Sequence, residues 1–355
     1  MDNELIIRIL LPAVSAFIIG LATTPVFTHL FYRYRLWKRS SRIDPKDNPQ
    51  MVKQAGEDIV KVHNHEETNT PRVGGIIVWF SVVLVVLLTY IISWVWPDTL
   101  DLQFINRNQT LLPLGSLLAG ALLGLVDDFL QIFGNQKQLA IGVPRFVRII
   151  FVSLLGVTEG IWFYSKLGYS AVELPFNLGA LELGVLFVPF FMIVVLAVFS
   201  SSIIDGIDGL AAGVLGIIFT TYGFIGIIQQ QYSIAIFCFV IMGALLAFLW
   251  FNIPPARFYL GETGILALTL PLATIIFLTN TLVEFIVIGL PLLATSASSV
   301  IQIISRRFFN YRVFRLAPLH HHFEAIGWPR EKVTMRYWVF SLMCSAIGLI
   351  LVIVG

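Results

Sequence analysis

The sequence predicts an all-α protein that crosses a membrane about ten times. Hydrophobic residues make up 57% of its 355 residues, charged residues make up only 12%, and the mean hydropathy is +0.85. Soluble domains carry about twice that share of charged residues. The apolar residues are gathered into runs long enough for a bilayer, and the basic residues favour one set of connections. We therefore expect a single integral-membrane domain over residues 1–355.

Ten apolar runs are candidates for membrane spans, since a spanning helix needs roughly 20 apolar residues. The first run is followed by Arg33 and Arg35 and has no convincing cleavage site, so we expect a retained helix and not a signal peptide. The third and eighth runs are short. The ten runs cover residues 5–30, 73–96, 111–127, 145–164, 184–204, 208–229, 232–251, 264–279, 282–304 and 335–354.

The basic residues orient these spans. Of the 23 Lys and Arg residues, only Arg8, Arg107 and Lys166 lie outside one set of connections. Cytoplasmic connections of membrane proteins are enriched in Lys and Arg, so ten spans place both termini on the extracytoplasmic side. On that side, the weak alternation of residues 165–183 predicts a small hairpin. The cytoplasmic set comprises residues 31–72, 127–148, 251–263 and 305–336.

Two acids separate the fifth run from the sixth. Asp205 and Asp208 lie in the stretch FSSSIIDGIDGLAAG, with long apolar runs on both sides. A charge at membrane depth costs about 3 kcal/mol or more unless it faces a polar cavity. If a helix starts near Asp205, the spacing of three places both acids on one face near its N-terminus. The pattern favours a polar site at a membrane surface over a short loop with two solvated acids.

Further polar residues lie on the same predicted side. Asp127 and Asp128 end the third run in LLGLVDDF, Glu262 precedes the eighth run in RFYLGETG, and residues 320–322 form a histidine triplet in APLHHHFEAIGWP. Alone, the acid pair is equally consistent with a helix cap or with two acids that face water. The triplet alone is consistent with a polar loop or a transition-metal site. Together with the basic connections, the acids suit Mg²⁺ and a phosphorylated substrate, because phosphoryl transfer chiefly needs positioning and charge neutralisation.

Several stretches resemble the polyprenyl-phosphate N-acetylhexosamine-1-phosphate transferase superfamily. They occur in order over nearly the whole chain: NTPRVGG, LLGLVDDF, IIDGIDGLAAG, FLWFNIPPARFYLGETG and RLAPLHHHFEAIGWPREKVTMRYWVFSL. The last one closely resembles the phospho-N-acetylmuramoyl-pentapeptide transferase branch. The resemblance implies a multi-pass bacterial plasma-membrane enzyme of peptidoglycan synthesis. It would use Mg²⁺ to move phospho-MurNAc-pentapeptide from UDP-MurNAc-pentapeptide to undecaprenyl phosphate, giving lipid I and UMP. It also suggests a homodimer and no nucleic-acid partner.

The resemblance implies catalytic roles for four residues and a metal-binding role for a fifth. Asp127 and Asp128 match the family's paired acids at the lipid phosphate and the metal. Asp205 matches an acid of the catalytic pocket, and His321 matches the histidine motif near the diphosphate. Glu262 takes the place of a metal-binding aspartate, so Glu262 and Asp128 are the expected metal ligands.

The resemblance also implies a substrate-binding set. Asp208 matches the acid that reads the uracil, Asn252 matches a nucleotide-pocket asparagine, and Tyr259 takes the place of a phenylalanine that stacks on uracil. His320 and His322, which match the histidine motif, are also expected to bind substrate. Arg72 and Lys137 are expected to bind substrate too, as cations that compensate for charge missing elsewhere.

The sequence departs from the family pattern at several positions. Gln131 stands where a lysine is expected and Glu67 where a basic residue is expected, which removes positive charge from a phosphate site. One explanation is that Arg72, Lys137 or Arg145 restores the positive charge that these two positions lack. The other departures are Arg72 for threonine, Ser202 for asparagine, Glu262 for aspartate and Ile265 for serine.

Three other functions stay open at this point. The first is the same chemistry with UDP-GlcNAc or another UDP-HexNAc. The second is a catalytically degenerate relative that binds lipid phosphate, which the departures motivate. The third is a transporter, since intramembrane acids also mark ion paths. The acids here gather at one membrane face and do not follow a route across, which disfavours transport.

Overall fold

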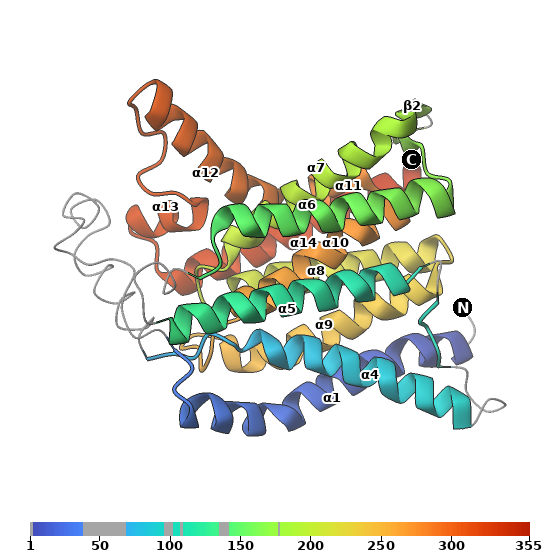
Figure 1. Ribbon diagram of the computed structural model, residues 1–355, viewed down its shortest axis with the longest axis horizontal. Helices are drawn as coiled ribbons and strands as arrows, with labels where there is room; N and C mark the ends of the chain where they lie inside the picture. Colours follow the sequence, from blue (N-terminus) through green and yellow to red (C-terminus); the bar gives the residue numbers. More distant parts are fainter. Residues whose placement is uncertain (1–2, 38–68, 96–101, 107–108, 135–141, 177) are drawn as a thin grey trace.

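The computed structural model shows a helical bundle whose long axis follows its helices (Figure 1). It describes residues 3–37, 69–95, 102–106, 109–134, 142–176 and 178–355. The helices are α1 (Asn3–Arg33), α4 (Gly75–Val95), α5 (Leu111–Phe133), α6 (Arg145–Trp162), α7 (Phe187–Ser200), α8 (Leu210–Ile228), α9 (Tyr232–Asn252), α10 (Gly261–Leu278), α11 (Leu282–Ile288), α12 (Leu290–Phe308), α13 (Leu319–Ala325) and α14 (Arg330–Val354).

Within these residues, nine helices are long and apolar enough to cross a membrane, and α11 with α12 forms a bent tenth candidate. The prediction of about ten spans is therefore confirmed, and the protein is a multi-pass membrane protein. The ninth run is not one straight helix, however. It bends by 81° between α11 and α12. Gly289 lies at the break and Pro291 follows at the start of α12, where its missing N–H costs no helical hydrogen bond. In Figure 1, α12 diverges from the bundle.

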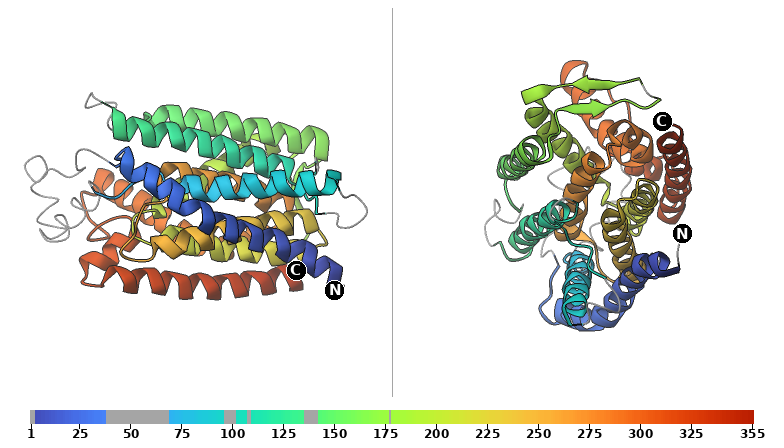
Figure 2. Two further views of the ribbon diagram at one scale, coloured as in Figure 1. Left: turned by 90° about the horizontal axis from the view of Figure 1, so that it is seen from below. Right: turned by 90° about the vertical axis from the view of Figure 1, so that its right-hand side faces the viewer.

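Helix α10 lies at the centre of the bundle. Of its membrane-crossing window, 94% is buried, against 28% for α1 and for α14. After its first turn, α10 is apolar around its whole circumference, as a helix is that lies in a protein core. Figure 2 shows the bundle along its axis, with the other helices arranged around the central ones. Helix α10 packs on α4, α5 and α7, so its two ends are fixed by several neighbours.

Helices α5 and α10 are in very close contact because α5 carries glycine at two facing positions. A Cβ atom at Gly120 would overlap the backbone of Leu266, and one at Gly124 would overlap the backbone of Glu262 and Thr263. Small residues let membrane helices approach to backbone contact. One turn further along α5, this approach brings Asp128 against the start of α10.

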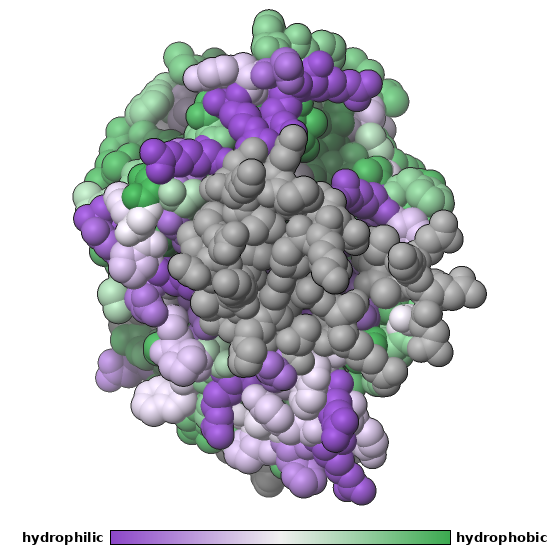
Figure 3. Space-filling model, turned by 90° about the vertical axis from the view of Figure 1, so that its left-hand side faces the viewer, coloured by the Kyte–Doolittle hydropathy of each residue, from purple (hydrophilic) through white to green (hydrophobic). Residues whose placement is uncertain are grey.

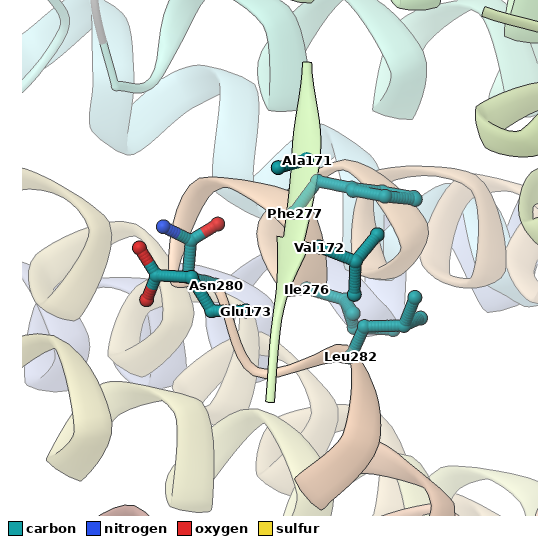
Figure 4. A pocket seen from close by; sticks show the side chains of 7 residues that line it. All are labelled: Ala171, Val172, Glu173, Ile276, Phe277, Asn280 and Leu282. Atoms are coloured by element: carbon teal, nitrogen blue, oxygen red, sulfur yellow. The ribbon is translucent and has the colours of Figure 1, made fainter. Parts of the chain in front are cut away.

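The two ends of the bundle differ. Both chain ends and the short hairpin lie at one end, and α13 lies at the other (Figure 1). In the hairpin, β1 (Ala171–Glu173) pairs antiparallel with β2 (Ala180–Glu182), as the weak alternation predicted. It covers a small pocket beside the turn between α10 and α11, where Glu173 and Asn280 project to the same side (Figure 4).

Two local predictions about the acids are wrong. Asp127 and Asp128 do not end a span, because α5 continues to Phe133. Asp205 and Asp208 do not start a helix together, because a 3₁₀ turn ends at Ile204 and α8 begins only at Leu210. Gly209, with φ of 73°, adopts a left-handed conformation that glycine tolerates and that a helix cannot contain. The two carboxylates therefore lie on an irregular turn, which lets them point to different partners.

The close contact between α5 and α10 leads us to expect that a larger residue at Gly124 destabilises the protein. Gly124→Ala should lower the free energy of unfolding by about 1–3 kcal/mol, because the added methyl group forces the two backbones apart. The measurement is thermal unfolding of the purified protein in detergent. Gly115→Ala is the matched control on the same helix, since a Cβ there meets nothing within 4 Å. Equal melting temperatures for the two variants would contradict this account of the contact.

Candidate active site

The N-terminus of α10 holds two of the predicted acids. The N–H of Gly261 donates to the Asp205 carboxylate. The N–H of Glu262 donates to Oδ1 of Asp128 at 3.2 Å, and the N–H of Thr263 donates to its Oδ2 at 2.9 Å. The first N–H groups of a helix have no partner within the helix, and the helix dipole favours negative charge there. The start of α10 is thus an anion-binding site that is occupied by two carboxylates from other parts of the chain.

The segment before α4 brings a positive charge to these acids. Its backbone pairs with residues before α10: Tyr259 N–H donates to the carbonyl of Pro71 at 2.8 Å, and Gly74 N–H donates to the carbonyl of Tyr259 at 2.9 Å. This pairing places Arg72 near both Asp128 and Asp205, close enough for electrostatic interaction with each carboxylate. Arg72 therefore supplies charge at the site, as one of the compensating residues expected from the sequence.

Gly261 makes this approach sterically feasible. Its φ of 69° lies in the left-handed region, and a Cβ atom there would overlap the carbonyl of Arg72 and lie 2.7 Å from Oδ2 of Asp128. A side chain at this position would be both strained and crowded. Glycine at 261 is therefore what allows the start of α10 and the Arg72 segment to meet at the carboxylates.

Asp205 is partly buried among charged groups. Burial raises the pKa of its carboxyl group to about 7, while the Arg72 charge acts in the opposite direction. The nearby carboxylates of Glu262 and Asp208 contribute to this raised pKa, and the hydrogen bond from the Gly261 N–H opposes it. Burial with several neighbouring charges is typical of functional carboxylates, although ion-pair networks also produce it.

Asp127 faces the other side of the same site. It is fully buried, and it accepts hydrogen bonds from the N–H of Val143 at 2.5 Å and from Nε2 of Gln131 at 2.7 Å. Nη1 of Arg148 lies 3.8 Å from its Oδ2 and 3.2 Å from Oε1 of Glu262. One guanidinium therefore links an acid of α5 to the acid at the start of α10.

Arg148 was not among the predicted site residues. A signal was present, because it lies four residues before the buried Val152 on α6 and so falls on the core-facing side of an apolar helix. Arg145, the compensating residue considered from the sequence, is exposed one turn earlier. Lys137 and Glu67 lie outside the described residues.

Asn252 joins the acidic turn to the loop that carries Tyr259. Its Oδ1 accepts from the N–H of Gly209 at 2.9 Å, and its Nδ2 donates to the carbonyl of Phe258 at 2.9 Å. Asp208 makes a second link, since its Oδ2 accepts from the N–H of Ala256 at 3.0 Å. The predicted substrate-binding residues Asp208, Asn252 and Tyr259 are therefore parts of one connected unit.

Two of the three histidines adjoin this unit. A Cβ atom at Gly206 would lie 2.5 Å from Nε2 of His320 and 3.2 Å from Nε2 of His321, so both rings lie against the acidic turn. Nδ1 of His321 lies 2.5 Å from Oε2 of Glu324, and Nε of Arg330 donates to Oε1 of Glu324 at 2.9 Å. The carboxylate of Glu324 thus fixes the orientation of the His321 ring.

His322 lies on the other side of α13. Its Nδ1 accepts from the N–H of Arg315 at 3.2 Å, and its ring contacts Phe314 with 5.6 Å between the ring centroids. Burial and the Arg315 charge lower its pKa. These contacts connect His322 to the segment after α12, whereas those of His320 and His321 are with the acidic turn.

The donor set is compatible with a divalent cation. Asp128, Glu262 and Asp205 offer hard oxygen ligands, and their charges interact with one another. Among the described residues, no three His, Cys, Asp or Glu side chains are grouped so as to hold a metal ion by themselves. Mg²⁺ is usually bound by one or two carboxylates, with waters and substrate phosphates completing its shell. The residues therefore fit a cation that is bound together with a phosphorylated substrate.

Hydrophilic residues gather on the end of the bundle that carries α13, in contrast to its apolar sides (Figure 3). Residues 110–280 match the family described as Glycosyl transferase family 4. The phospho-N-acetylmuramoyl-pentapeptide-transferase of Latilactobacillus sakei is 31% identical over 347 residues, which cover 97% of this chain and 98% of that protein. The chain belongs to the phospho-N-acetylmuramoyl-pentapeptide transferase family.

Other members are similar to the chain over nearly its full length. Proteins of the same name from Enterococcus faecalis and Chloroflexus aggregans are 30% and 29% identical, over 96% and 98% of the chain. They are covered over 98% and 90% of their own lengths. The resemblance drawn from the motifs is therefore confirmed.

The two hydrogen bonds of the Asn252 side chain can be tested by a substitution that removes one of them. Asn252→Asp keeps an acceptor for Gly209 but places an oxygen against the carbonyl of Phe258. We expect a loss of about 1–3 kcal/mol in the free energy of unfolding, the cost of leaving a buried partner unsatisfied. Thermal unfolding in detergent measures it, with Asn310→Asp as the same change at an exposed position. An Asn252→Asp protein that melts like the Asn310→Asp protein would show that the link is not formed.

Proposed function

We propose that the protein transfers phospho-MurNAc-pentapeptide from UDP-MurNAc-pentapeptide to undecaprenyl phosphate, releasing UMP, at the cytoplasmic face of a bacterial plasma membrane. The observation that carries the proposal is the meeting of acids from α5, the turn before α8 and the start of α10. They lie beside two arginines at one end of a membrane bundle. Family membership supports the choice of substrates. The homodimer stays an expectation from the motif resemblance.

In the proposed reaction, an oxygen of the lipid phosphate attacks the sugar-linked phosphorus of the UDP-sugar. A new P–O bond forms between the lipid phosphate oxygen and the sugar-linked phosphorus. The P–O bond from that phosphorus to the bridging oxygen of the diphosphate breaks, and UMP leaves with this oxygen and the electron pair. A phosphate monoester has its second pKa near about 6, so near neutral pH the attacking oxygen is largely ionised. The demand on a general base is small, and Asp127 is assigned to orienting the lipid phosphate.

Charge neutralisation is the larger task, because both substrates are anionic. Asp128 and Glu262 are the proposed Mg²⁺ ligands, and the bound ion would neutralise charge on the phosphates. Asp205 lies beside them on the acidic turn, where the N–H of Gly261 holds its carboxylate. Arg72 supplies a fixed positive charge next to Asp128 and Asp205, and Lys137 remains a proposed phosphate-binding residue.

The nucleotide is assigned to the unit that Asn252 ties together. Tyr259 offers an aromatic face to the uracil, and Asp208 offers carboxylate oxygens to its N–H group. Asn252 fixes the acidic turn relative to the loop with Tyr259 through its hydrogen bonds to Gly209 and Phe258. The histidines of α13 are assigned to the diphosphate side, with His320 and His321 against the acidic turn.

The function is tested by UMP release from the purified protein in detergent. Undecaprenyl phosphate and Mg²⁺ or Mn²⁺ are supplied, with UDP-MurNAc-pentapeptide and UDP-GlcNAc in parallel reactions. We expect release that needs both lipid and metal and that occurs with the pentapeptide substrate. Release with UDP-GlcNAc alone would assign the protein to the other sugar branch. No release from folded protein with either sugar would support a non-catalytic role.

A substitution at Asp127 tests its assigned role. Asp127→Asn should lower kcat at least about 100-fold, because orientation of a reacting group contributes several kcal/mol to catalysis. The UMP-release assay measures this, and Glu331→Gln, an exposed acid in the first turn of α14, is the control. Full turnover by Asp127→Asn would remove Asp127 from the mechanism.

A further inference from the structure

Arg148 occupies a position between two acids that belong to different helices. It lies in the first turn of α6, and its Nη1 is 3.2 Å from Oε1 of Glu262 on α10 and 3.8 Å from Oδ2 of Asp127 on α5. The side chain is 18% exposed, whereas that of Asp127 is fully buried. The guanidinium therefore forms part of the wall of the site and is still partly accessible.

The chemistry of the guanidinium leaves donors for a third anion. It has five N–H donors in a planar fork that matches phosphate oxygens as well as carboxylates. Both contacts to described acids use the single nitrogen Nη1. A carboxylate that holds one edge of an arginine fixes its plane and so reduces the entropy lost when the remaining donors bind a ligand.

The charges around Arg148 also favour a role for its guanidinium in binding a third anion. Gln131, one turn after Asp127, donates a hydrogen bond to Asp127 but brings no charge. Glu262 is one methylene longer than an aspartate and makes the shorter of the two contacts to Arg148. Arg148 contacts both of these acids, and the charge of Arg72 acts on the neighbouring Asp128 and Asp205.

We propose that Arg148 binds a phosphate group of a substrate, with Glu262 holding its guanidinium in position. The proposal rests on the proposed transferase function, and it adds a phosphate-binding residue on α6 that the motifs do not contain. The phosphate belongs either to the polyprenyl lipid or to the diphosphate of the UDP-sugar. Both sources present the same chemistry, so the experiment varies them separately.

The test is steady-state UMP release by Arg148→Gln, Arg148→Lys and the control Arg145→Gln, which changes an exposed arginine one turn earlier on α6. Each substrate is varied at saturating concentrations of the other. We expect Arg148→Gln to raise KM for one of the two substrates at least about tenfold, the usual effect of losing a charge-assisted hydrogen bond, with a smaller change in kcat. Arg148→Lys should recover part of this loss, because it restores charge without the planar fork.

Melting temperatures and direct binding separate this role from a structural ion pair. Unchanged KM values for both substrates, in an Arg148→Gln protein that melts like the wild type, would overturn the proposal. If Arg148→Gln does not fold, Arg148→Lys decides, since unchanged KM values in that folded variant contradict phosphate binding. If the wild type releases no UMP, the transferase proposal fails. Calorimetric titration with undecaprenyl phosphate and with UDP-MurNAc-pentapeptide then shows whether Arg148→Gln weakens either complex at least about tenfold, and equal affinities would reject the role of Arg148.

Discussion

The site depends on the first three N–H groups of α10, which bind the carboxylates of Asp205 and Asp128. Inside a membrane protein, a helix start without partners and a carboxylate without partners are each costly, and here each satisfies the other. The arrangement requires α10 to begin where Gly124 of α5 contacts it, because Asp128 lies one turn further along α5 and reaches the first N–H groups of α10 from there. It also requires glycine at 261, because a side chain there would displace the Arg72 segment.

The same constraint explains why the site is rigid on its membrane side and accessible at its end. Helix α10 is almost wholly buried, so the position of its N-terminus is set by packing along its length. The groups assigned to substrates lie on the connections beyond it: the acidic turn, the loop with Tyr259, and α13. Asn252 couples the first two of these through paired hydrogen bonds. Fixed carboxylates and connected loops suit phosphoryl transfer, in which the protein positions groups and neutralises charge.

The sequence predicted the number and placement of the spans, because the bilayer imposes a length on each apolar run. It did not predict the bend between α11 and α12, since hydropathy is continuous across Gly289. The acids at 205 and 208 were recognised as a site from their depth and their motif, but their helix was placed wrongly, because the left-handed Gly209 interrupts it. Arg148 was missed because its contacts join α5, α6 and α10, and no local spacing records a contact between distant helices. The sequence feature that indicates a site role for Arg148 is its position on the core-facing side of the apolar helix α6.

The most direct test of the account is a crystal structure with UDP-MurNAc-pentapeptide and Mn²⁺ bound. The account predicts the uracil against Tyr259 and beside Asp208, with the diphosphate and the ion at the N-terminus of α10 between Glu262 and the acidic turn. A nucleotide bound away from the start of α10, or an ion that contacts neither Asp128 nor Glu262, would contradict it.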